Sequence, residues 1–287
     1  MVTVQGWSAA QVSALDDGDV CVRYCDALRR RIVAAPRAVK AADDFVCPPE
    51  HLAGWNAFQE KVENGQDINP YLSKRHASLF NLDGLLGEWG VHHFHLGIGA
   101  DTKNPAYMAR TGSLLYALVT DTAFCAINVF SHESFEDSSV LESIHRNWPE
   151  MIRRYRANGV TGATWTSDQR RALRGKNGNV LTTVSDGTVY LPITGGVMAS
   201  GVNAEAVRFA DYWQMRVREL QTALEDKLDD LLLTLGQNGY AGEPEIEATL
   251  QFSEAGVHAF FPKYGVRAIL NVTDSPLGDS RLGSRMS

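Results

Sequence analysis

Apolar positions near the start of the chain recur at the spacing of amphipathic helices. Over residues 9–34 they return at steps of three and four, although Gly18 interrupts the pattern. A second segment of this kind spans 51–64, and Gly65 follows it where a helix cap would stand. A connector that ends in a Pro-Pro pair separates the two segments. The pattern predicts two leading helices.

Three apolar, strand-like runs follow, at 90–96, 114–120 and 123–131. The last two flank a three-residue turn, Thr120-Asp121-Thr122, and therefore predict an antiparallel hairpin. A helix over about 138–158, with one apolar side buried, is expected to close this region.

The second half of the chain predicts hairpins around one long helix. Residues 159–179 are rich in glycine and basic side chains, and they mark the expected domain boundary. The remaining elements are a hairpin over 180–192 that turns at Asp186-Gly187, a helix over 204–235 capped by Asn203, a hairpin over 247–262 and a strand over 266–272.

These elements together predict an α+β protein. We expect residues 1–158 to form one domain, in which leading helices precede a small antiparallel sheet. Residues 159–287 are expected to form a C-terminal α+β part with β-hairpins and one long helix.

Composition and charge exclude some classes of protein. The hydrophobic fraction of 44% and the charged fraction of 21% are those of a globular chain. The formal net charge of -7 argues against broad coating of nucleic acid, while a local basic cleft stays open. No apolar run is long enough for a membrane span and no signal-peptide pattern begins the chain, so we expect a cytoplasmic protein with no membrane partner.

The stretch WGVHHFHLG, residues 89–97, places three histidines within four positions. Side chains alternate along a strand, so His93 and His95 share one face. His92 joins the apolar side chains on the other face, which we expect to be the core face. His132 follows the run 123–131, and pairing of that hairpin with this strand would bring it toward His93 and His95.

Two chemistries fit such a cluster. In acid–base catalysis, one imidazole takes a proton while another gives one, and RNA cleavage through the ribose 2′-hydroxyl also needs a cation. Lys74, with its neighbours Arg75 and His76, and Arg110 are candidate cations. In metal binding, the HxH pair and Glu133 would hold zinc or a related divalent ion. Packed or solvated histidines without chemistry are the third interpretation.

Two acidic residues and two basic runs have alternative interpretations. Asp83 and Glu88 could orient a histidine through its second ring nitrogen, but Asp-Gly favours a turn. The runs at 153–156 and 170–176 could line an RNA path, but a solvated helix end and linker are favoured.

The order of elements over about 51–150 resembles the RelE/ParE-like toxin fold, within the barnase–EndoU–colicin–RelE group of ribonucleases. HLAGWNAFQEKVEN and INPYLSKRH precede WGVHHFHLG, and RTGSLLYALVTDTAFCAINVFSH supplies a hairpin. Arg110 looks like the arginine often found beside the second strand in that group, and His132 like its C-terminal catalytic residue. Toxins of this group are usually small and basic, whereas this chain is long and acidic.

The sequence therefore predicts a metal-independent endoribonuclease of toxin or phage-defence type, without a cofactor. His93, His95 and His132 would share the acid and base roles, and Arg110 and Lys74 would stabilise phosphate charge. RNA is the expected partner, and an inhibitory protein partner and a homodimer stay open. The alternatives are a metal-dependent hydrolase that uses the same histidines with a divalent metal, and a non-catalytic protein-binding module with a toxin-like fold.

Overall fold

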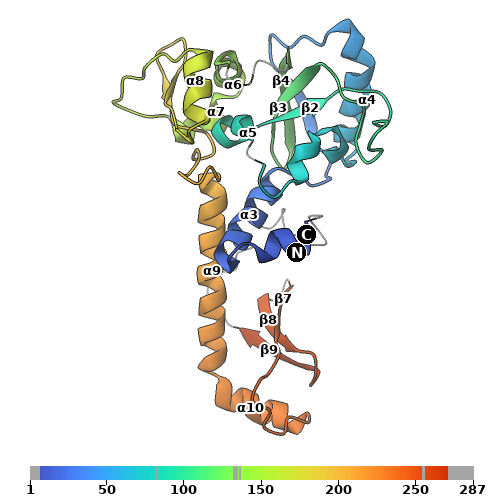
Figure 1. Cartoon of the computed structure of the whole chain (residues 1–287), viewed down its shortest axis with the longest axis vertical. Coiled ribbons are helices and arrows are strands. Elements are labelled where there is room, and N and C mark those ends of the chain that lie inside the picture. The colour runs from blue at the N-terminus through green and yellow to red at the C-terminus, as the bar shows by residue number, and fades with distance from the viewer. Residues whose placement is uncertain (1–6, 82, 132–134, 136, 254–255, 271–287) are drawn as a thin grey trace. The chain divides into compact units, whose positions relative to one another are not determined.

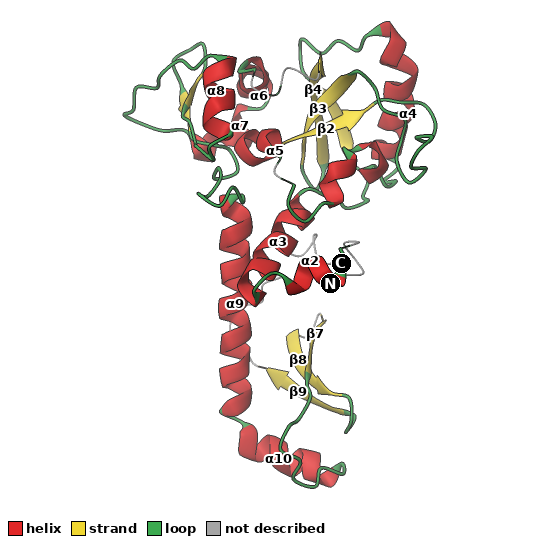
Figure 2. Cartoon of the chain, in the orientation of Figure 1, coloured by secondary structure: helices red, strands yellow, loops and turns green. Residues whose placement is uncertain are grey.

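The computed structural model describes residues 7–81, 83–131, 135, 137–253 and 256–270. Contacts divide the chain into two compact units, Met1–Ala210 and Asp211–Ser287. Each unit combines helices with a small, mainly antiparallel sheet, so the expected α+β class is confirmed (Figures 1 and 2). Residues 159–210 belong to the same compact unit as the main sheet, and a boundary between independently folding domains at 158 stays a prediction.

A four-stranded sheet in the order β1-β4-β3-β2 forms the centre of the first unit. Strands β2 (Val91–His95), β3 (Ser113–Val119) and β4 (Ala123–Ser131) are antiparallel neighbours and lie where the sequence pattern places them. The structure adds β1 (Ala38–Ala41), which runs parallel to β4 in a segment expected to be a connector. This edge strand is mostly exposed, so it lacks the hydrophobic alternation that identifies a strand.

One face of this sheet is covered by α4 (Leu52–Glu63), as Figure 1 shows. Phe58 of α4 is fully buried at the centre of the contact. Its ring centroid lies 5.0 Å from that of Phe94 in β2 and 5.3 Å from that of Phe124 in β4. The aromatic cluster fixes the helix on the sheet, because edge and tilted ring contacts add to the burial of large apolar surface.

The opposite face of the sheet is also buried, which corrects the expectation of a single core face. Helix α6 (Ser139–Asn147) packs Leu141 and Ile144 there, against a cluster that includes Val91 and Tyr116. His93 and His95 share this face with Val91, since every second side chain of β2 points the same way. Both histidines therefore stand beside a hydrophobic core and not on an open polar surface.

Several helices are shorter than the sequence pattern predicts. The first expected helix is divided into α2 (Ala9–Ser13) and α3 (Asp17–Arg29). Asp16 separates them because its carboxylate accepts a hydrogen bond from the backbone amide of Asp19, at 2.7 Å, and so begins a new helix. The helix expected over 138–158 ends at Asn147. Pro149 then begins α7 (Pro149–Ile152), which leads into η4 (Arg153–Tyr155).

The segment expected to be a solvated linker contains a helix, α8 (Ser167–Arg174). A capping box between Thr166 and Gln169 begins it, and this short motif is visible in the sequence only once a helix is assumed. Arg170 of this helix has a side chain only 2% exposed. The interpretation of the basic run at 170–176 as merely water-facing is therefore wrong for Arg170.

The hairpin after α8 and the cap of the long helix lie as expected. Strands β5 (Thr182–Thr183) and β6 (Val189–Tyr190) are connected through a turn that holds Gly187 at a φ of 86°. Asn203 caps α9 (Ala204–Glu225), because its side-chain oxygen accepts a hydrogen bond from the backbone amide of Glu205 at 2.8 Å.

The second unit is built from the later part of α9, helix α10 (Leu228–Gln237) and one sheet. The helix expected over 204–235 is interrupted at Lys227, whose backbone leaves the helical range. Strands β7 (Thr249–Ser253), β8 (Gly256–Phe261) and β9 (Val266–Leu270) form the expected antiparallel sheet. Within the described ranges, none of the helices combines the length and apolar character that crossing a bilayer requires.

Helix α5 (Gly84–Trp89) connects these parts of the first unit. Its Glu88 is buried and accepts hydrogen bonds from the guanidinium groups of Arg170 and Arg174 on α8. Both guanidinium groups also lie over the ring of Trp89, 5.1 and 5.0 Å from its centroid. The three charges compensate one another in the interior, so removal of any one of them is expected to lower the free energy of unfolding substantially.

We expect Glu88→Ala to lower the free energy of unfolding by about 3–5 kcal/mol, because it leaves two guanidinium groups in the interior without their carboxylate. Denaturant unfolding followed by tryptophan fluorescence measures the change. Glu150→Ala is the matched control, since Glu150 pairs with Arg153 while its side chain is 79% exposed, and it should cost less than about 1 kcal/mol. Equal losses in the two variants would contradict the role given to Glu88.

Candidate functional site

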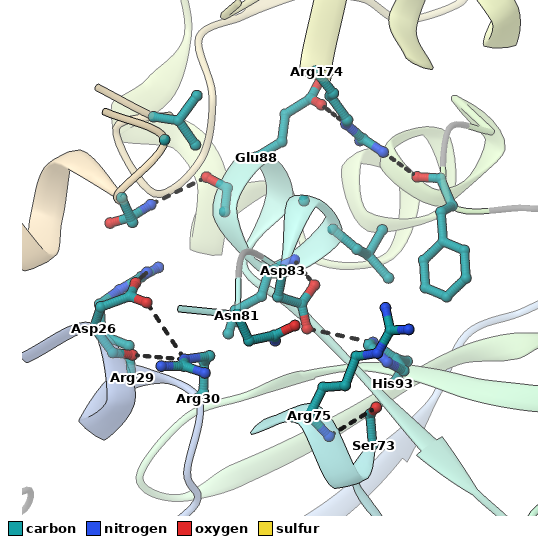
Figure 3. Close-up of a pocket in the computed structure, with 18 of the residues that line it drawn as sticks. Asp26, Arg29, Arg30, Ser73, Arg75, Asn81, Asp83, Glu88, His93 and Arg174 are labelled. Carbon is teal, nitrogen blue, oxygen red and sulfur yellow. Dashed lines mark hydrogen bonds and ion pairs between the residues drawn. The ribbon is translucent and has the colours of Figure 1, made fainter. Parts of the chain in front are cut away.

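A cavity of about 720 Å³ lies in the first unit beside α5 and β2 (Figure 3). This volume is in the range of roughly 300–1,000 Å³ that small-molecule sites occupy. Six arginines and three acidic residues line it: Arg29, Arg30, Arg75, Arg110, Arg171, Arg174, Asp26, Asp83 and Glu88. The excess of cations is a local property, because the chain as a whole carries a net charge of -7.

Most of these charges are paired inside the protein. Asp26 of α3 lies 3.4 Å from the Nε of Arg30, and burial raises the pKa of its carboxyl group although Arg30 and Arg29 oppose the shift. Glu88 is shared by the two arginines of α8. Neither carboxylate is therefore left to repel an anion from the cavity.

Two arginines of the wall are different. The side chains of Arg75 and Arg110 are exposed and form no hydrogen bond or ion pair with the residues that the structure describes. A guanidinium group without a protein carboxylate can donate paired hydrogen bonds to a phosphate. These two residues give the cavity its capacity to bind an anion.

His93 faces the same cavity from β2. Its Nδ1 lies 3.6 Å from Oδ2 of Asp83, and Figure 3 shows this carboxylate directed at the ring. The ring edge meets Phe135, with centroids 5.2 Å apart. Nδ1 is buried and forms no hydrogen bond with the described residues, whereas Nε2 keeps contact with solvent. Of the two ring nitrogens, Nε2 is therefore the one that a ligand in the cavity can reach.

Local backbone structure explains how Asp83 and His93 meet. Asp83 is the N-cap of α5, and its Oδ1 accepts a hydrogen bond from the backbone amide of Leu86 at 3.0 Å. Gly90 ends the helix in the left-handed region, at a φ of 68°, and the chain then enters β2 directly. Because the helix is so short, its cap at one end lies beside the strand that begins at the other. Asp83 is therefore a helix cap and not a turn residue, and its second carboxylate oxygen faces the histidine without a hydrogen bond.

The other histidines of β2 have different surroundings. His95 is 1% exposed and does not line the cavity, and its Nδ1 accepts a hydrogen bond from the backbone amide of Thr111 at 3.1 Å. His92 lines the cavity although it projects from the opposite strand face. His132, the third expected catalytic histidine, lies outside the described residues.

The two expected cations are separated by the structure. Arg110 lines the cavity, but Lys74 does not. The Nζ of Lys74 lies 2.8 Å from Oδ1 of Asp101, and this hydrogen bond lowers the pKa of the Asp101 carboxyl group. Arg75, the next residue along the chain, lines the cavity instead. Both residues belong to a tight turn, η3 (Lys74–Ala77), in which neighbouring side chains point in different directions.

His76 on the same turn is a cavity residue that the sequence identifies only as one of several cations. It is buried, and its Nδ1 donates a hydrogen bond to the carbonyl oxygen of Ser73 at 2.8 Å. Arg30 fixes the turn, because its Nη1 donates to the carbonyl oxygens of His76, at 2.9 Å, and Ser78, at 2.7 Å. The run KRH is the signal in the sequence for this wall of the cavity.

A metal site receives no support from the part of the chain that the structure describes, where no three His, Cys, Asp or Glu side chains form a group that could hold an ion. Glu133, named for the metal-dependent alternative, lies outside those residues. The chain matches no family model, no curated protein and no solved structure. The resemblance to the RelE/ParE-like toxins stays a prediction, and the chemistry of the site has to be argued from its own residues.

We expect Arg75→Ala and Arg110→Ala each to weaken binding of a fluorescent single-stranded RNA made entirely of 2′-O-methyl nucleotides. Each variant removes a charge-assisted contact worth about 1.5–3 kcal/mol, or roughly 10- to 100-fold in the dissociation constant. Fluorescence anisotropy gives the constants. Arg153→Ala is the control, because that side chain is 72% exposed and lies outside the cavity. An equal loss in the control would mean that binding is spread over the surface.

Proposed function

We propose that the protein is a metal-independent endoribonuclease of toxin or phage-defence type, and that it cleaves RNA in this cavity. The observation that carries the proposal is the surroundings of His93. One ring nitrogen faces the carboxylate of Asp83 and the other is open toward a cavity lined by the unpaired guanidinium groups of Arg75 and Arg110. A proton-transfer group and phosphate-binding cations are the parts that RNA cleavage requires.

The reaction uses only groups of the substrate and the protein. A base removes the proton of the ribose 2′-hydroxyl, and the 2′-oxygen forms a bond to the adjacent phosphorus. The bond between phosphorus and the 5′-oxygen then breaks, and an acid donates a proton to that oxygen. The products are a 2′,3′-cyclic phosphate and a 5′-hydroxyl end.

His93 is assigned the role of the acid. The carboxylate of Asp83 lies 3.6 Å from Nδ1, on one side of the ring, so Nε2 is the ring nitrogen that faces the cavity. Arg75 and Arg110 would bind the phosphate and stabilise the negative charge that builds on its oxygens during attack. In the view of Figure 3, the Arg75 side chain extends toward His93. Arg75 takes the place that the sequence gave to Lys74.

The proposal also accounts for an acidic protein acting on RNA. Nonspecific binding to a duplex backbone needs many cations on the surface. Here the unpaired cations are collected in one recess, so a flexible single strand that can bend into the cavity would be favoured over a rigid helix.

We expect purified protein to cleave single-stranded RNA in the presence of EDTA and to leave an oligonucleotide of 2′-deoxy residues intact. His93→Gln should reduce the rate by about 10²- to 10⁴-fold, because it removes a positioned acid. Gel electrophoresis of a labelled oligonucleotide measures both results.

Two histidine variants serve as controls. His51→Gln changes a residue outside the cavity and should leave the rate unchanged. His95→Gln should lower thermal stability more than activity, since the buried ring accepts a backbone hydrogen bond. Cleavage that requires added metal, or that survives in His93→Gln, would contradict the proposal.

A further inference from the structure

The proposed cleavage needs a base as well as an acid, and one further imidazole of the cavity wall has a ring nitrogen without a hydrogen bond. The assignment of this imidazole as the base rests on the proposed function. His76 lines the same cavity as His93 but comes from η3, a different element of the wall.

The hydrogen bonds of His76 identify which ring nitrogen is free. Nδ1 lies 2.8 Å from the carbonyl oxygen of Ser73, which can only accept, so Nδ1 carries the proton. The backbone carbonyl of His76 accepts a hydrogen bond from Arg30, and its backbone amide donates to Ser73. Nε2 is then the one polar atom of the residue without a partner among the described residues, and it retains access to solvent. In the neutral ring this atom carries a lone pair.

The charges around His76 favour that neutral ring. Burial lowers the pKa of the imidazole, and the nearby guanidinium groups of Arg31 and Arg30 lower it further. The hydrogen bond to Ser73 and the carboxylate of Asp67 oppose the shift without cancelling it. The ring is also fixed in orientation by an edge contact with Tyr107, with centroids 5.7 Å apart.

We propose that His76 is the general base of the cleavage reaction, with Nε2 accepting the proton of the ribose 2′-hydroxyl while His93 protonates the 5′-oxygen. The substrate class follows from this pairing. It is single-stranded RNA whose ribose 2′-hydroxyl is free, because a 2′-deoxy or 2′-O-methyl nucleotide has no proton for Nε2 to remove. Arg75 has a separate role, because it binds the phosphate on which both histidines act.

The pH dependence of kcat/KM tests the role of His76. The base acts unprotonated, so activity should fall as the pH drops through a pKa below the ordinary histidine value near 6.5. His76→Asn is the informative variant, because its side-chain amide can still donate to the Ser73 carbonyl while it offers no base. We expect it to lose about 10²- to 10⁴-fold in kcat/KM and to lose the acid limb of the profile. His76→Gln is a second variant, which places an amide near Nε2.

A substrate with an activated leaving group distinguishes the two histidines. In uridine 3′-(p-nitrophenyl phosphate), the departing phenolate needs no proton, so an acid is dispensable and a base is not. The defect of His93→Gln should shrink by at least about tenfold on this substrate, whereas that of His76→Asn should stay as large as on RNA. A structural role for His76 would not produce this difference.

The outcomes separate the two proposals. Wild-type protein that cleaves no RNA would overturn the proposed function and this inference together. RNA cleavage that depends on His93, with a His76→Asn variant that melts at the wild-type temperature and keeps its rate and acid limb, would overturn this inference alone. If both His76 variants melt below the wild-type temperature, the deciding experiment is the addition of free imidazole to His76→Gly. Restored RNA cleavage supports the base role of His76, and no restoration contradicts it.

Discussion

A buried carboxylate shared by two arginines is the interaction on which the site depends. Glu88 has its side chain 8% exposed, and removing a charge from water to this degree is costly unless the partners are close. Arg170 and Arg174 supply those partners and lie over the ring of Trp89. A helix as short as α5 has little stability of its own, so these contacts with α8 hold it in place.

The position of α5 determines the geometry of the chemistry. Its first turn is capped by Asp83, which faces His93, and its last residue is followed by Gly90, which directs the chain into β2. On the other wall, Arg30 binds the carbonyl oxygens of η3 and so orients His76. The ionic groups near the cavity are therefore largely structural, and the few that stay unpaired are those that can act on a ligand.

Periodicity in the sequence predicts the main sheet well and the charged parts of the fold poorly. The strands β2, β3 and β4 carry long apolar runs, and they form as expected. Strand β1 and helix α8 do not, because one is an exposed edge and the other buries an arginine that looks like a surface residue. Burial of Arg170 depends on a partner 82 positions away, and no local pattern encodes it.

The site shows the same division between local and tertiary information. Alternation along β2 correctly places His93 and His95 on one face, yet only His93 lines the cavity. In the tight turn η3, successive side chains point in different directions, so Arg75 lines the cavity. Lys74 is instead bound by Asp101. The sequence identifies His76 only as a candidate cation. Its role as a base follows from the hydrogen bond to Ser73, which determines which ring nitrogen is free.

The most direct measurement is a crystal structure of the protein with a 2′-deoxyuridine-containing dinucleotide that it can bind but cannot cleave. The account predicts a phosphate in the cavity within hydrogen-bond distance of the guanidinium group of Arg75 or Arg110, with Nε2 of His93 facing the 5′-oxygen and Nε2 of His76 facing the 2′ position. A dinucleotide bound elsewhere on the protein, with the cavity free of phosphate, would contradict it.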